Sequence, residues 1–309
     1  MIALIFVKQS APQNIIETTD FISRKLFHLD KNLFSLKDRT SYSKKCDMYL
    51  PEQRKKITVT VYLSSTEDGL LECLSEFDRQ VFSACLTLHE NNLGYVTPQL
   101  IAKLLKGQPD SPSVFDRHSS QRLATSNRRT LKEKIIASLH RLMHTRIKFS
   151  VEELRRFSKY QVSDSYEGLL IPMTTTNTIS VNGTVENVLL FGETPPLYQF
   201  AKDLGHFVTY DVTLRATGHK GSTSLELSNF LLSEIAFSRG GSFTLLWNTL
   251  YIIFTVTDRR LKVAFRKKIS LLLDFFVGRK ILVSYTIDAT MIIGQTQNLT
   301  TFHNSDDMA

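Results

Sequence analysis

The stretch DRRLKVAFRKKISLLLDFFVG, residues 258–278, decides how this chain folds. Its apolar residues recur at steps of three and four, which predicts a helix over 258–277 with one buried face. That apolar stripe consists of Leu261, Phe265, Ile269, Leu272 and Phe276. Cations crowd the remaining faces of the N-terminal half, whereas the C-terminal half is nearly all apolar. We therefore expect one end of the helix to be anchored in a core and the other end to present positive charge.

The segments around this helix predict a winged-helix order of elements. A helix that starts at Ser222 or Ser224, a short strand at 243–245 and a second helix at 247–254 come before it. Two strands, 280–287 and 290–294, follow it and form a hairpin. Helix, strand, helix, helix and hairpin are the elements of a helix-turn-helix with a β wing.

The first half of the chain predicts the same order. After a strand at 57–63, Ser75 is the expected N-cap of a first helix, and Thr97 with Pro98 starts a second. A third helix is expected over 126–144. Strands are then expected at 147–151, 169–173, 178–181 and 185–191, the last two joined by Asn182 and Gly183 as a two-residue turn.

The expected fold class is α+β, with two tandem winged-helix domains. Residues 1–55 are predicted to be an N-terminal arm, and 35–56 in particular a mobile or loosely docked segment with little periodicity. Residues 56–192 are expected to be the first winged-helix domain, with an enlarged β wing. Residues 193–309 are expected to be the second, with a polar C-terminal tail.

The positive charge is concentrated on the third helix of each unit. The chain has a formal net charge of +8, which favours a polyanionic partner. Residues 117–148 hold nine Lys and Arg against one acidic residue, and residues 259–280 hold eight against one. Two basic helices at matching places favour nucleic-acid binding over a merely solvated basic face.

The expected ligand is double-stranded DNA. Arginine can bind guanine through two hydrogen bonds and asparagine can bind adenine in the same way, while serine is a common phosphate ligand. The candidate DNA-binding residues are Arg117, Ser120, Arg122, Asn127, Arg128, Arg129, Lys132, Arg259, Arg260, Lys262, Arg266, Lys267, Arg279 and Lys280. The last two begin the second wing, which places them near the phosphate backbone.

No motif of the sequence predicts an enzyme. It has no P-loop, no dinucleotide fingerprint, and no His-x-His cluster beside a tyrosine, so we expect no catalytic residue, no cofactor and no metal site. His140 and His144 share a helix face but lack a third ligand. Three sparse cysteines fit a reducing cytoplasm, and no apolar run reaches the roughly 20 residues of a membrane span.

Several stretches resemble plasmid-type replication initiators from Gram-positive bacteria. The similar segments are residues 77–81, 96–101, 104–107, 196–201 and 259–278, and the resemblance covers roughly 55–295. It implies tandem winged-helix domains that bind repeated origin sequences (iterons), often with a monomer–dimer switch. The insert at about 149–191 and the arm at 1–55 depart from the compact family pattern.

Three functions are consistent with these observations. The first is initiation of plasmid or mobile-element replication at direct repeats, with host replication proteins as further partners. The second is transcriptional regulation by the same fold, which would favour a palindromic site and a homodimer. The third is a non-enzymatic scaffold whose basic faces bind an acidic protein or a membrane without any preference for a DNA sequence.

Overall fold

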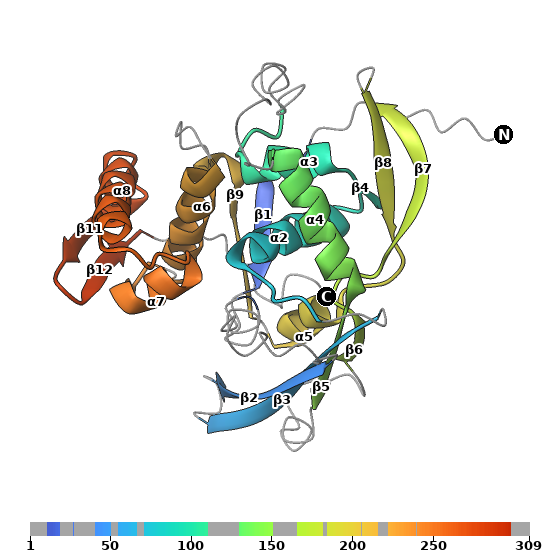
Figure 1. Cartoon of the computed structure of the whole chain (residues 1–309), viewed down its shortest axis with the longest axis horizontal. Helices are drawn as coiled ribbons and strands as arrows, with labels where there is room; N and C mark the ends of the chain where they lie inside the picture. Colours follow the sequence, from blue (N-terminus) through green and yellow to red (C-terminus); the bar gives the residue numbers. More distant parts are fainter. Residues whose placement is uncertain are drawn as a thin grey trace.

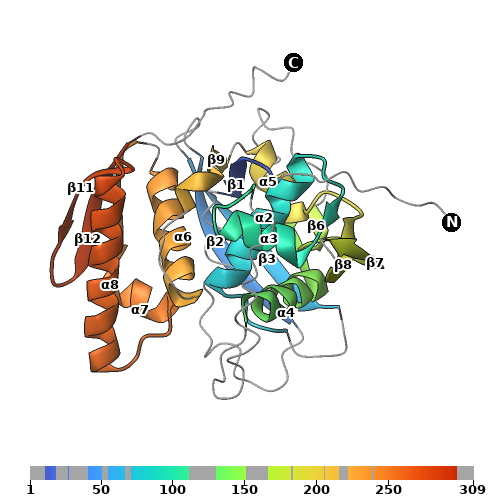
Figure 2. The same ribbon diagram turned by 90° about the horizontal axis from the view of Figure 1, so that it is seen from above.

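Two groups of helices lie side by side in the computed structural model, joined through helices α2 and α6 (Figures 1 and 2). The structure describes residues 11–18, 27, 41–50, 55–66, 71–110, 130–150, 166–181, 184–204, 206–215, 222–238 and 240–297. Helices and small antiparallel sheets make up the described parts, which confirms the expected α+β class.

The first group begins at two of the expected caps. Ser75 accepts from the Asp78 backbone and the Asp78 carboxylate accepts from Ser75, which starts α2 with a capping box. Thr97 caps the second helix, with Pro98 at its first position. The elements are α2 (Glu76–Glu90), β4 (Tyr95–Val96), α3 (Pro98–Leu105) and α4 (Leu131–His144).

Helix α4 begins later than expected. Thr130 is its N-cap, in a second capping box with Glu133, so the predicted start at Ser126 was wrong. The predicted start was wrong for a physical reason. Ser126 and Thr130 are both residues that cap helices well, but only Thr130 is followed by an acidic residue three positions later. Ile135, Leu139 and Leu142 are buried, as expected.

A three-stranded sheet completes the first group. Strand β7 (Met173–Val181) pairs with β8 (Thr184–Phe191), and β8 pairs with β4, giving the order β4-β8-β7. Val181 pairs with Thr184, so the connection has the expected two residues, which themselves lie outside the described part of the chain. The strand predicted at 169–173 was wrong, because 170–172 fall between two strands.

The second group repeats the first in both order and sheet topology. Its elements are α6 (Ser222–Phe237), β10 (Ser242–Leu246), α7 (Trp247–Ile253), α8 (Arg259–Gly278), β11 (Leu282–Ile287) and β12 (Met291–Thr296). The strand order β10-β12-β11 matches β4-β8-β7, since in each case the strand after the first helix pairs with the last strand. Phe243 closes against Gly294 so tightly that an added Cβ would lie 2.3 Å from the phenyl ring.

A four-stranded antiparallel sheet lies below the first group in Figure 1 and contacts the C-terminal end of α4. Its order is β2-β3-β5-β6, and its strands are β2 (Ser41–Leu50), β3 (Lys55–Ser65), β5 (Thr145–Ser150) and β6 (Tyr166–Leu169). The expectation of a loosely docked segment over 35–56 was therefore wrong for Ser41–Leu50. Ten residue pairs join β2 to β3. The hydrogen bonds between the two strands come from the backbone, so they form even though the polar side chains of β2 show no apolar alternation typical of a strand.

Helix α5 (Pro196–Asp203) covers one face of this sheet. Phe200 of α5 stacks on Phe149 of β5 at a ring separation of 4.7 Å and meets Tyr166 of β6 edge-on at 5.3 Å. The boundary predicted between 192 and 193 stays a prediction, although α5 packs on strands of the first half.

Two further strands tie the chain's beginning to its middle. Strand β1 (Asn14–Thr18) pairs antiparallel with β9 (Phe207–Asp211), which a short 3-10 helix, η5 (Val212–Arg215), follows. The sequence did not predict either strand. Ile15 is fully buried, and the Ile16 backbone bonds with Ser83 and Thr87 of α2, so this pair belongs to the core.

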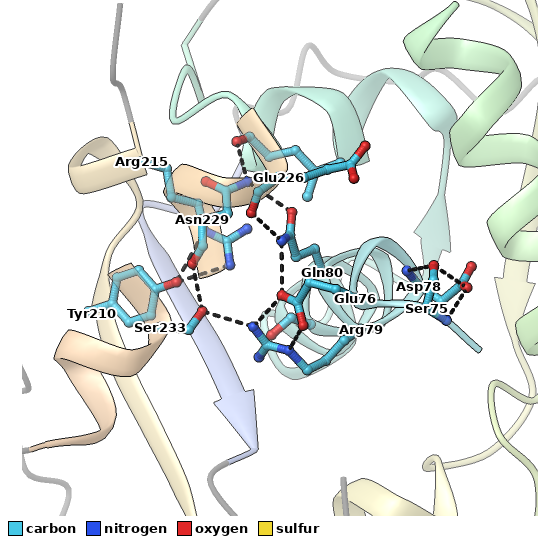
Figure 3. Close-up of polar contacts among 12 residues, drawn as sticks. Ser75, Glu76, Asp78, Arg79, Gln80, Tyr210, Arg215, Glu226, Asn229 and Ser233 are labelled. Carbon is cyan, nitrogen blue, oxygen red and sulfur yellow. Dashed lines mark hydrogen bonds and ion pairs between the residues drawn. The ribbon is translucent and has the colours of Figure 1, made fainter. Parts of the chain in front are cut away.

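The contact between α2 and α6 is polar as well as buried (Figure 3). Gln80 of α2 donates to the backbone of Glu226 at 2.9 Å, and Asn229 of α6 donates to Gln80 at 3.3 Å. Arg79 donates to Ser233 at 3.2 Å while forming a salt bridge with Glu76. A polar side chain buried in this contact without a hydrogen bond would be costly, so these bonds favour one relative position of α2 and α6.

Candidate nucleic-acid interface

Helices α7 and α8 are joined by a short turn that aromatic packing holds in place. Phe254 in the turn contacts Phe230 of α6 at 5.5 Å and Phe265 of α8 at 5.4 Å between ring centroids. Thr255 takes a left-handed backbone conformation with φ of 55°, which redirects the chain into α8. Asp258 then caps α8 by accepting from the backbones of Arg260 and Leu261.

The buried face of α8 differs from the expected stripe at one position. Phe265, Ile269, Leu272 and Phe276 are buried, but Leu261 is 57% exposed. Leu261 lies one turn before Phe265, the first α8 residue that meets the aromatic turn, so no core reaches it. The N-terminal turns of α8 therefore project beyond the packed part of the second group.

The outward face of α8 combines cations with small apolar side chains. Arg260, Val263, Ala264 and Lys267 are all exposed and lie at steps of three or four, opposite the buried face. Neither Arg260 nor Lys267 forms an ion pair with any residue in the described ranges. Two unneutralised cations that flank small side chains leave this face able to approach a polyanion closely.

Arg266 is held rather than free. Its Nε donates to the Tyr251 hydroxyl at 2.6 Å, and its terminal nitrogen donates to the Ala289 carbonyl at 3.1 Å. The guanidinium also lies over the Trp247 ring at 4.6 Å. Lys262 is held in a similar way, with its ammonium 4.9 Å from the centre of the Tyr251 ring. These two predicted ligands orient the surface whether or not they also contact DNA.

The hairpin turn at 288–290 is fastened to α7 and α8. Trp247 donates its indole N–H to the Asp288 carbonyl, and its backbone N–H bonds to Thr290. The Asp288 carboxylate accepts from the backbones of Thr290 and Met291, and these bonds lower its pKa. The hairpin β11–β12 is thus set at a fixed angle beside the exposed face of α8.

Arg279 and Lys280 lie at the junction of α8 and the hairpin. Arg279 is the C-cap of α8, with its guanidinium over the Phe275 ring at 5.5 Å. Lys280 has a φ of 58°, and its backbone bonds with Val277 while Ile281 bonds with Phe276. That pair of bonds is a Schellman motif, in which the left-handed position usually holds glycine.

One cation of α8 faces the molecule instead of solvent. Lys268 is partly buried, which lowers its pKa, while the nearby Glu226 of α6 acts in the opposite direction. The same carboxylate binds Lys134 of α4 at 3.0 Å. Glu226 of α6 is therefore bonded to α4 and lies near Lys268 of α8, and neither lysine is on the outward face.

The predicted ligands of the first group fall mostly outside the described part of the chain. These residues are Arg117, Ser120, Arg122, Asn127, Arg128 and Arg129. Lys132 lies on α4 and is partly exposed. Arg141 binds the buried Asp78 at 2.7 Å, and Lys148 binds Glu167 at 2.8 Å. Part of the basic surplus of 117–148 is thus used for internal ion pairs.

Four residues of the interface were not in the predicted set. Val263 and Ala264 lie opposite the apolar stripe of α8, and a helical projection of 258–278 would have placed them there. Trp247 and Tyr251 hold cations of the next helix, and no sequence spacing predicts that contact.

Among the residues that the structure describes, no group of three or more His, Cys, Asp or Glu is placed to hold a metal. In the same ranges, no helix combines the length and the apolar character of a membrane span.

No family model and no curated protein matches the chain. Two solved structures of RctB are similar in arrangement. One is the crystal structure of RctB domains 2-3, with a TM-score of 0.40 and 10% identity over 84% of this chain and 93% of that chain. The other, of selenomethionine derivatives of the same two domains, has a TM-score of 0.41 and 11% identity over 90% and 96%. Likenesses of this size carry no functional argument.

Proposed function

We propose that this chain is a non-enzymatic, sequence-specific double-stranded-DNA-binding protein built from two winged-helix domains. We further propose that it initiates replication of a plasmid or mobile element at repeated origin sites in the cytoplasm. The observation that carries the proposal is the outward face of α8, where Arg260 and Lys267 flank Val263 and Ala264 beside a fastened hairpin.

The duplicated topology supports the winged-helix assignment. Each group runs helix, strand, helix, helix and hairpin, with β5 and β6 inserted before the hairpin of the first group, and each sheet places the first strand beside the last. A third helix that is exposed at its N-terminal half fits the major groove, with the wing against the neighbouring backbone. Arg260 is suited to guanine, and Val263 and Ala264 are suited to thymine methyl groups.

The proposed target is a set of direct repeats rather than a palindrome. An initiator is expected to bind a tandem array of direct repeats, whereas a dimeric repressor is expected to bind a palindrome. The resemblance of 77–81, 96–101 and 259–278 to plasmid initiators favours the same choice. A transcriptional regulator of the same fold is the second candidate.

The test is binding to duplex DNA that flanks the protein's own gene, against scrambled duplexes of equal length, at two salt concentrations. The double variant Arg260→Gln/Lys267→Gln should weaken specific binding and reduce the log–log salt slope by about one unit for each lost phosphate contact. The charge-matched control is Arg146→Gln/Lys148→Gln, which removes two cations from the separate four-stranded sheet.

Three outcomes distinguish the candidate functions. Preference for direct repeats that the control variant retains and the α8 variant loses supports an initiator. Preference for a palindrome supports a regulator. Equal, salt-sensitive binding to specific and scrambled DNA leaves only a polyanion-binding scaffold and contradicts the proposal.

A further inference from the structure

The four-stranded sheet β2-β3-β5-β6 has one covered face and one open face. Side chains alternate along β5, where Ile147 and Phe149 are buried while Arg146 and Lys148 are exposed. Helix α5 packs on the buried side through Phe200. In the described part of the chain, no helix or strand covers the opposite side.

Strand register places an aromatic ring at the centre of the open face. Tyr62 of β3 pairs across the ladder with Ser43 of β2 on one side and with Lys148 of β5 on the other. Lys148 in turn pairs with Glu167 of β6. Tyr62 is 45% exposed although β3 is an inner strand of the sheet. Its ring is therefore available to a flat ligand.

The open face is hollowed around this ring. A hollow of about 310 Å³ is lined by Ser41, Ser43, Tyr62, Arg146, Lys148 and Glu167, among others. That volume is at the lower end of small-ligand sites, which suits one nucleotide. The lining combines a π surface, hydroxyl groups and cations, which are the groups that bind a base, a sugar and a phosphate.

The charge on this face is positive on balance. Lys45 lies two residues from Ser43 on β2, so it is on the same face of the sheet, and it is exposed. Among the described side chains, this face therefore has the cations Lys45, Arg146 and Lys148 and the carboxylate of Glu167. Glu167 bonds to Lys148 at 2.8 Å and lies 3.7 Å from Arg146, and the hydrogen bond with Lys148 lowers the pKa of Glu167. The ionised carboxylate holds both cations beside the tyrosine and competes with any anion that approaches them.

We propose that the open face of this sheet binds single-stranded DNA, with a base stacked on Tyr62 and the backbone phosphates paired with Arg146 and Lys148. This site is separate from α8 and goes beyond the proposed duplex binding. Single strands are favoured over duplex because a base within a duplex has both faces stacked, whereas an exposed aromatic ring on a sheet binds unpaired bases.

The experiment measures fluorescence anisotropy of a labelled oligothymidine of about 12 nucleotides, a length within the range that one sheet platform covers. The first comparison strand is an abasic oligomer of equal length, which carries the same phosphates and no bases. Thymidine monophosphate is the second probe, added as a competitor. Wild-type protein should bind the oligothymidine more tightly than the abasic strand, and the monophosphate should compete only weakly.

Four variants separate stacking from charge. Tyr62→Ala should weaken oligothymidine binding by roughly tenfold and abolish the preference over the abasic strand, whereas Tyr62→Phe should retain both. Glu167→Gln should tighten binding, because it releases Arg146 and Lys148 to phosphates. Arg146→Gln/Lys148→Gln should weaken binding to both strands and reduce the salt slope by about 0.7 per lost contact.

A second measurement does not depend on how well the variants fold. Photocrosslinking of a halogenated uracil strand to the wild-type protein, followed by peptide mapping, should identify Tyr62. Equal binding of both strands, or a crosslink only to α8, overturns the proposal. Strong competition by the monophosphate overturns it in favour of a nucleotide pocket. The α8 variant Arg260→Gln/Lys267→Gln should leave single-strand binding intact, so failure here is distinct from failure of the duplex proposal.

Discussion

The Arg266 guanidinium lies 4.6 Å from the centre of the Trp247 ring, and both side chains donate to backbone carbonyls of the same hairpin turn. Trp247 starts α7 and Arg266 lies in α8, so the pair joins both helices to the turn of the β11–β12 hairpin. We expect the position of the hairpin beside α8 to depend on this contact.

We predict that Arg266→Ala loosens the hairpin and weakens duplex binding by about tenfold while unfolding free energy falls by only about 1–2 kcal/mol. Arg266→Lys should restore little, because an ammonium cannot stack flat on Trp247 and also donate in two directions. Trp247 is the only tryptophan, so its fluorescence reports directly on this site. An unchanged emission spectrum in Arg266→Ala would mean that the contact does not hold the hairpin.

Lys280 offers a test in which stability and DNA binding change in opposite directions. Its left-handed φ of 58° is strained for a lysine but not for a glycine, so Lys280→Gly should raise the unfolding free energy by about 0.5–1 kcal/mol. If the ammonium contacts a phosphate, the same variant should lose about one unit of salt slope. Thermal melting and binding titrations measure the two effects.

Lys280→Ala is the matched control, because it removes the same charge without relieving the backbone. It should reproduce the loss of salt slope and give no gain in stability. Equal salt slopes for wild type and both variants would show that Lys280 does not contact DNA.

The end of α8 explains why sequence patterns predict helices better than their junctions. Helix α8 ends at Gly278, within one residue of the predicted end, but the left-handed residue is Lys280, because Ile281 must reach the core beside Phe276. Core packing outweighs the preference for glycine at that position. The amphipathic period of 258–278 fixed the helix itself, including the burial of Phe265.

The strands that were missed have partners far away in the sequence. Asn14 pairs with Asp211, and β2 is a polar strand that is stable because of its ladder with β3. Local pattern carries no information on such partners. The candidate site divides in the same way: the cations of α8 were predicted from their spacing, whereas the fixed position of Arg266 depends on Trp247 and Ala289, which only the tertiary fold brings together.

Acid should open the hairpin turn only at low pH. Backbone N–H groups of Thr290 and Met291 lower the pKa of Asp288, so its contribution to stability is present above the ordinary aspartate pKa and is lost as pH falls through the lower folded value. The Thr290 amide resonance should therefore stay constant at pH 5 and shift only in stronger acid. Asp288→Asn should remove that titration, and a shift that persists in the variant would assign it to another group.

Removing one member of the buried Glu76–Arg79 pair should reduce the unfolding free energy much more than its share of the loss when both members are removed. Both side chains are 3–4% exposed, and Arg79 also bonds to Ser233 across the α2–α6 contact. Glu76→Gln removes the carboxylate that is paired with the buried Arg79 guanidinium and should cost about 3 kcal/mol or more in urea unfolding. Glu76→Met/Arg79→Met removes both charges and should cost clearly less than the sum of the single variants.

The exposed Glu167→Gln is the control and should cost less than about 1 kcal/mol. Additive losses in the double variant would mean that the two charges do not interact, and that the α2–α6 contact depends on each of them separately.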